Sequence, residues 1–211
     1  MKLRTENALR WSPLVVGSLL LTLLLSACNF GFGGNSSASA TPTAQPAPTQ
    51  PAPTQSSAST LTTYTGDGFT IGYPAGWTAK QNATGVVLSD STGVATLAVE
   101  LVPNPNGSLP IAPLIQNAMN SAQGQGKNFQ TVPIAPTTTV GGDSWSQAAA
   151  TGDSTRNGQT VNMKIVVLAD NHPANAANTR TYLIVYGTAT RLFDTANTTL
   201  FQPMLQSFKF A

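Results

Sequence analysis

The stretch from residue 29 to residue 63 cannot form a packed core, and this confines the folded part of the chain to the residues after it. The stretch is rich in Pro, Thr, Ala and Ser, and no aromatic residue occurs between Phe32 and Tyr64. Its apolar area is too small to offset the loss of chain entropy on folding. Five prolines between Pro42 and Pro53 favour extended polyproline II. The composition therefore predicts a disordered tether with a reach on the order of 100 Å.

The segment before this tether has the organisation of a bacterial export signal. Basic residues lie within the first ten positions, and residues 14–25 form an apolar run of twelve. That run is shorter than the roughly 20 residues that span a bilayer, but it fits the apolar region of a signal peptide. The run ends in Leu25, Ser26, Ala27 and Cys28, which resembles the lipobox of bacterial lipoproteins.

The lipobox resemblance implies cleavage between Ala27 and Cys28 and transfer of a diacylglyceryl group to the Cys28 thiol. Two or three acyl chains bury enough methylene groups for a stable membrane anchor, whereas one chain does not. We therefore expect a signal peptide over 1–27, a lipidated tether over 28–63 and a domain over 64–211, held on the extracytoplasmic face of the cell membrane. The alternatives are an ordinary secretory signal with a chance cysteine, or an uncleaved anchor helix.

Charge and cysteine content exclude several kinds of partner. Charged residues make up 9% of the chain, and equal numbers of basic and acidic residues follow Cys28. Without a basic stripe there is little to neutralise phosphates, so we expect no nucleic-acid partner. Because Cys28 is the only cysteine, neither an internal disulfide nor a thiolate metal cluster can form.

The domain over 64–211 is predicted to be α+β, with a central antiparallel sheet flanked by helices. Apolar residues repeat at helical spacing from Ile111 to Ala122, before Gly124, and again from Phe193 to Leu205, where Pro203 should kink the helix or restart it. The strand candidates, chosen by alternation and β-branched content, are 68–73, 86–88, 94–102, 129–134, 144–151, 160–169 and 180–188.

Two motifs resemble the PsbP family and its bacterial lipoprotein relatives, the DcrB-like and LpqN-like proteins. The first is FTIGYPAGW, with Phe69, Tyr73 and Trp77, and the second is the chain end SFKF, with Phe208 and Phe210. The resemblance covers roughly 64–211 and implies an α/β/α sandwich. Most of the matching positions are expected to be turn and core residues, because proline and glycine preset turns and aromatics bury large areas.

The ionisable residues suggest no catalytic site, so we expect the domain not to be an enzyme and to have no cofactor. His172 is the only histidine and is expected in an exposed loop; a triad with Ser144 and Asp143 is not expected, because no GxSxG turn is present. One histidine and scattered carboxylates supply too few ligands for a metal site. The calcium or histidine metal sites of some PsbP relatives find no matching cluster here.

The carboxylates are also expected to be structural. Glu100 is the only glutamate after Cys28, and the six aspartates fall mostly in turn-like contexts such as TGDG, GGDS and TGDS. In such contexts an aspartate usually caps a turn through its side-chain oxygen.

The sequence leaves three functions open. The leading prediction is a membrane-anchored surface lipoprotein with a non-catalytic domain that binds or assembles an envelope protein partner. The second is a small-ligand-binding or enzymatic envelope protein with a pocket between sheet and helix. A third, taken from the family name, is an extrinsic subunit of photosystem II. A concave apolar pocket with polar groups converging around Asp143, Asp170 or His172 would favour the second prediction, and an exposed aromatic patch would favour protein binding.

Overall fold

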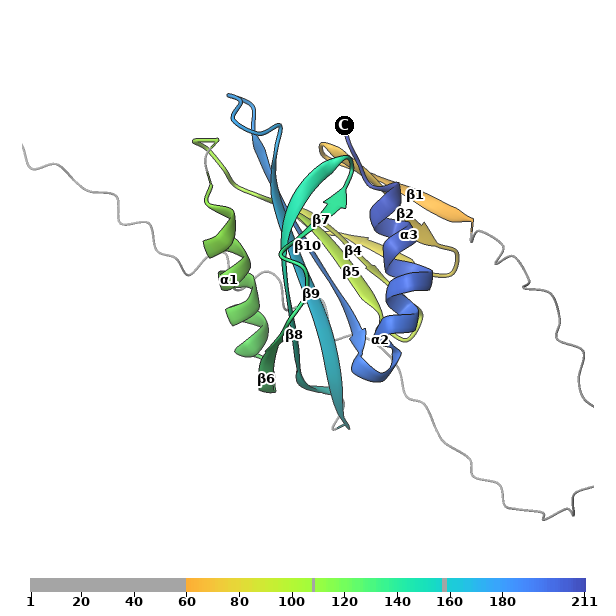
Figure 1. Ribbon diagram of the computed structural model, residues 1–211. Coiled ribbons are helices and arrows are strands. Elements are labelled where there is room, and N and C mark those ends of the chain that lie inside the picture. Colours follow the sequence, from red (N-terminus) through yellow and green to blue (C-terminus); the bar gives the residue numbers. More distant parts are fainter. Residues whose placement is uncertain (1–59, 108, 157–158) are drawn as a thin grey trace, which may run out of the picture.

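The computed structural model describes residues 60–107, 109–156 and 159–211. An antiparallel sheet forms the centre, with the helix α1 (Ile111–Gln123) on one face and the C-terminal helical segment on the other. Figure 1 shows the three layers edge-on. The predicted α+β class, a sheet with helices on both faces, is confirmed.

The large sheet has eight strands in the order β3-β4-β5-β10-β9-β8-β6, with β7 also paired to β8. All of its strand pairs are antiparallel. The strands are β3 (Thr78–Gln81), β4 (Gly85–Ser89), β5 (Thr96–Val102), β6 (Lys127–Val132), β7 (Thr137–Val140), β8 (Asp143–Arg156), β9 (Gln159–His172) and β10 (Arg180–Ala189).

A small sheet joins the two ends of the described domain. It has the order β1-β2-β11, with β1 (Leu61–Gly66), β2 (Phe69–Pro74) and β11 (Lys209–Phe210). Phe210 pairs with Phe69, so the two motifs that carried the family resemblance lie side by side. Phe69 and Phe208 stack with ring centroids 5.8 Å apart, and both are buried. The motif aromatics are therefore core residues, as predicted.

The period of two along the central strands divides the apolar residues into two cores. We call the sheet surface under α1 the α1 face, and the opposite surface the α2–α3 face. On β9, Val166 and Leu168 belong to the core on the α2–α3 face, whereas Val167 and Ala169 belong to the core on the α1 face. Both faces of β9 and β10 are thus buried, which explains their nearly continuous apolar sequences.

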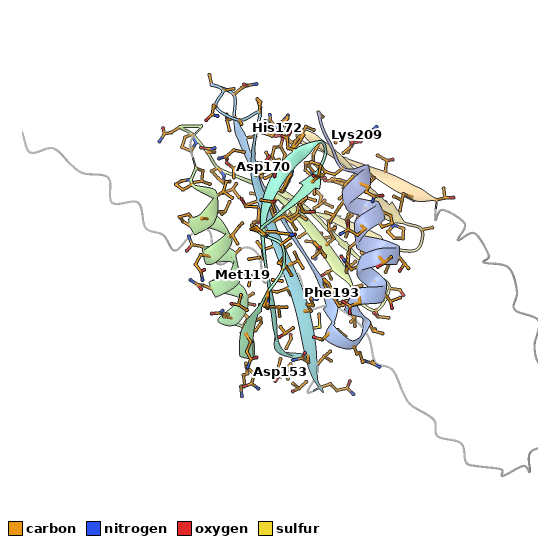
Figure 2. All side chains as sticks on the ribbon, viewed as in Figure 1. Met119, Asp153, Asp170, His172, Phe193 and Lys209 are labelled. Carbon is orange, nitrogen blue, oxygen red and sulfur yellow. The ribbon has the colours of Figure 1, made fainter. Side chains whose placement is uncertain are left out.

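The helix α1 follows the predicted apolar stripe. Leu114, Ile115 and Met119 are its buried residues, and Figure 2 shows Met119 between the helix and the sheet. The helix ends at Gln123, and Gly124 donates a backbone hydrogen bond to the carbonyl of Asn120. Most of its contacts are with β8 and β9, so the α1 face beyond these strands is less fully covered.

The C-terminal helical segment passes through a wide turn before its proline. It consists of α2 (Thr190–Ala196), the π-helical turn η2 (Asn197–Phe201) and α3 (Gln202–Ser207). Pro203 lies in the first turn of α3, where the missing N–H does least damage. This is the fresh helical start predicted at Pro203.

Several sequence expectations were incomplete. The strands β1, β3 and β7 and the two-residue strand β11 were not predicted, and β1 begins at Leu61, inside the stretch assigned to the tether. These strands are short and mostly polar, so they lack a clear alternating signal. The β8 and β9 pair extends as far as Arg156 opposite Gln159. Asp153 consequently lies within a strand rather than in a turn, and its carboxylate accepts hydrogen bonds from Asn128 and Asn162.

We predict that Gly85→Ala destabilises the domain by about 2–3 kcal/mol, because overpacking at a tight site forces the backbone apart. A Cβ at Gly85 would lie 1.9 Å from the carbonyl oxygen of Val99 on the neighbouring strand. Gly124→Ala is the matched control, since its Cβ would meet atoms no closer than 3.6 Å. Urea unfolding should show Gly124→Ala within about 0.5 kcal/mol of the parent. Equal effects of the two substitutions would contradict this explanation by packing.

Candidate ligand-binding site

The histidine singled out by sequence is a packing residue at the end of β9. His172 is its last residue and is half-buried, not in an exposed loop as predicted. Its Nδ1 hydrogen-bonds to Asp143 Oδ2 across the sheet, and its ring stacks on Phe210 with centroids 3.5 Å apart. The expectation failed because the strand continues three residues past its last apolar residue, Ala169. His172 thus helps to hold the C-terminal strand.

The structure brings Asp143 and His172 together but not Ser144. Asp143 is on the α2–α3 face with Trp145, and alternation along β8 places the exposed Ser144 on the α1 face. The three residues therefore do not form a triad. Burial raises the pKa of the nearby Asp170, and the Asp143 carboxylate adds to the rise, while a backbone hydrogen bond from Asn171 and the charge of His172 oppose it.

Within residues 60–107, 109–156 and 159–211, no three His, Cys, Asp or Glu side chains are grouped so as to hold a metal ion. In the same ranges no helix has the length and apolar character needed to cross a membrane. The lipidation residue Cys28 and the lipobox residues Leu25, Ser26 and Ala27 lie outside the described residues.

An open cleft of about 650 Å³ lies at the junction of the two sheets. Arg180 Nη1 donates to Asp67 Oδ1 at 2.9 Å, and Asn104 donates to Thr181 at 2.7 Å. The charged groups of the cleft are thus paired with each other, and Asn104 is held by a residue outside the cleft lining. In Asn82 the side-chain Oδ1 accepts hydrogen bonds from Thr84, but the buried Nδ2 has no hydrogen-bond partner.

A second hollow, which we call the α1 pocket, lies between the C-terminal half of α1 and the sheet. Its volume is about 410 Å³, within the usual range for small-molecule sites. The residues that line it are uncharged and come from α1, β5, β6, β8, β9 and β10 and the loop after α1. The apolar lining includes Ala118, Ala122, Phe129, Ile165, Val167 and Val185.

The α1 pocket exists because α1 covers β8 and β9 more fully than β10 and β5. Val185 remains partly exposed in the middle of β10, although the residues on either side of it are buried. Gln125 lines the pocket, and its side-chain oxygen is buried without a hydrogen-bond partner. The pocket therefore combines apolar walls with an uncharged lining, an arrangement suited to a largely apolar ligand.

Glu100 lies on the same face of the sheet, in the middle of β5. Alternation separates it from Val99 and Leu101, which pack on the α2–α3 face, and places it with Val102 on the α1 face. Its cross-strand neighbours are Gly85 on β4 and Leu183 on β10. Glu100 is only 9% exposed, and within the described residues its carboxylate has neither a hydrogen bond nor an ion pair.

Burial raises the pKa of the Glu100 carboxyl above its ordinary value of 4.5, because a charged group loses hydration in this apolar setting. The Glu100 carboxylate oxygens are not among the fully buried polar atoms without a partner, so they keep some contact with solvent, where a ligand could reach them. Sequence reasoning grouped Glu100 with the structural carboxylates and missed it. The available signal was its position as the one charged residue in the strand sequence TLAVELV.

Comparison of the chain with family models gave no match, and neither did comparison with curated proteins. Among solved structures, the chain is similar to LpqN, described as involved in cell envelope biogenesis of Mycobacterium tuberculosis. The two chains share 15% sequence identity with a TM-score of 0.42, over 72% of this chain and 91% of LpqN. LpqN-like proteins are among those that the sequence motifs resemble.

The raised pKa of Glu100 gives a prediction about stability and pH. The folded state holds this proton to a higher pH than the unfolded chain, so it binds more protons in that interval and its stability falls as pH rises through it. Glu100→Gln should remove this fall and leave the variant more stable than the parent at pH 7.5, but not at pH 4.

Urea unfolding at the two pH values measures this difference. Asp194→Asn is the control for loss of one negative charge, since the Asp194 side chain is 98% exposed and its neutralisation should change stability little at either pH. An identical pH dependence in the parent and Glu100→Gln would show that burial imposes no cost on the ionised carboxylate.

Proposed function

We propose that this protein is a membrane-anchored lipoprotein whose extracytoplasmic domain binds a small, largely apolar ligand without catalysing a reaction. The observation that carries the binding function is the α1 pocket, which combines concave shape, apolar walls and uncharged lining. The anchor is supported by the sequence alone, through the short apolar run and the lipobox ending in Cys28.

The distribution of apolar side chains supports a ligand over a protein partner. Within the described residues, Leu192 is the one large apolar side chain that is strongly exposed, at 46%. The aromatic residues of the family motifs are wholly or partly buried, so they do not form the flat exposed patch that protein binding would favour. Of the functions left open by the sequence, ligand binding in a pocket between sheet and helix is therefore the better supported. This pocket lies on the α1 face, not around Asp143, Asp170 or His172 as expected from the sequence.

The anchor can be tested by Cys28→Ser, which removes the thiol that would carry the diacylglyceryl group. We expect the variant to leave the membrane fraction or to accumulate as the unprocessed precursor, because the chain has no second cysteine to carry the lipid. Fractionation and intact-mass measurement distinguish these forms. Normal cleavage with full membrane retention would contradict the lipoprotein assignment.

The pocket can be tested by filling it from the helix. We expect Ala122→Trp to reduce the affinity for 1-decanol at least tenfold, because the indole would occupy the space between α1 and the sheet. Ala112→Trp is the matched control, since Ala112 is exposed at the other end of the same helix and does not line the pocket. Displacement of an environment-sensitive fluorescent dye measures both affinities. Equal decanol binding by the two variants would place the ligand elsewhere.

A further inference from the structure

We infer that Glu100 is the headgroup-binding residue of the α1 pocket, and that it selects amphiphiles with a positively charged ammonium head. This inference rests on the proposed function, because the apolar chain of such a ligand would occupy the α1 pocket. It adds the chemical class of the ligand and the residue that recognises it.

The strand register places Glu100 in line with the pocket. On the paired strands β5 and β10, Thr96 lies opposite Gly187, Ala98 opposite Val185, and Glu100 opposite Leu183. Thr96, Gly187 and Val185 line the pocket. Glu100 is two residues beyond the level of Val185, which is about 7 Å along the strands.

The surface between the pocket and Glu100 is apolar and not fully covered. Ala98 and Val185 lie on this path and both are partly exposed, as is Val87 on the neighbouring strand β4. Gly85, the β4 neighbour of Glu100, carries no side chain. A linear chain leaving the pocket along β5 and β10 would therefore meet apolar side chains first and then the carboxylate.

The charges around Glu100 favour a cationic head. The elements α1 and β4 contain no ionisable residue, and on β10 alternation directs Arg180, Tyr182 and Tyr186 to the opposite face. Lys80 pairs with Val87, which puts it on the α1 face, but it is exposed on the edge strand β3 and forms no ion pair with Glu100. The ionised carboxylate is thus uncompensated, and a ligand ammonium would supply both the missing charge and hydrogen-bond donors.

Burial opposes ionisation of the Glu100 carboxyl in the unliganded fold and so raises its pKa. A neutral glutamine of similar shape would avoid that cost. Carboxyls whose pKa is raised by burial are concentrated at binding and active sites, where a ligand can supply the missing interaction.

The test compares three ligands with the same ten-carbon chain: decylamine, which is protonated at pH 7.5, 1-decanol and decanoate. We expect the parent protein to bind decylammonium at least tenfold more tightly than decanol, and decanoate most weakly, because a charge-assisted hydrogen bond replaces a neutral one. In Glu100→Gln the preference for the ammonium should disappear, while decanol affinity stays within about threefold. Circular dichroism checks that the variant is folded.

A pH series separates recognition from a structural effect. Decylammonium affinity of the parent should fall as pH drops through the raised pKa of Glu100, because the carboxylate becomes protonated, and Glu100→Gln should lack this dependence. Decanol affinity should vary little in either protein.

The outcomes distinguish the two proposals. If decanol binds but decylammonium binds no more tightly, or if Glu100→Gln keeps the ammonium preference, the role of Glu100 is overturned and the α1 pocket stands. If none of the three chains binds, both the pocket and the headgroup assignment are overturned.

Discussion

The strands β9 and β10 are buried on both faces, and the rest of the domain is arranged around this constraint. Their side chains alternate between two cores. Along each strand, odd-numbered and even-numbered residues therefore face different helices, one set facing α1 and the other the C-terminal helical segment. Residues of the neighbouring strands face the same side of the sheet as the β9 or β10 residues with which they pair. This parity puts His172 on one face and Glu100 on the other, and it gives the two residues unrelated roles.

The sequence was most informative where one physical pattern was long. The strands β9 and β10 and the stripe of α1 were predicted because their apolar periods extend over many residues. The motifs FTIGYP and SFKF were correctly taken as core, and they meet as paired strands. Short polar strands such as β3 and β7 were missed, because their backbone is held by neighbours and not by apolar alternation.

The site was less predictable than the fold, for two reasons. A pocket depends on which strands a helix leaves uncovered, and the stripe on α1 does not say that β8 and β9 lie beneath it. An isolated carboxylate such as Glu100 also looks like any surface residue until the register buries it between Gly85 and Leu183. His172 was misplaced for the related reason that its partners, Asp143 and Phe210, are remote in sequence.

The proposed anchor and the proposed site would act together. A domain held by lipid at Cys28 on a long tether would remain close to membrane amphiphiles, and the α1 pocket with Glu100 would accept one with a cationic head. The contact between a ligand ammonium and the Glu100 carboxylate is the interaction on which this selectivity depends.

The most direct measurement is a crystal structure of the domain with decylammonium bound. We expect the decyl chain between α1 and the sheet, beside Val185, with the nitrogen at hydrogen-bond distance, about 2.8 Å, from a Glu100 oxygen. A chain bound outside the α1 pocket, or a nitrogen directed away from Glu100 into solvent, would contradict the proposed selectivity.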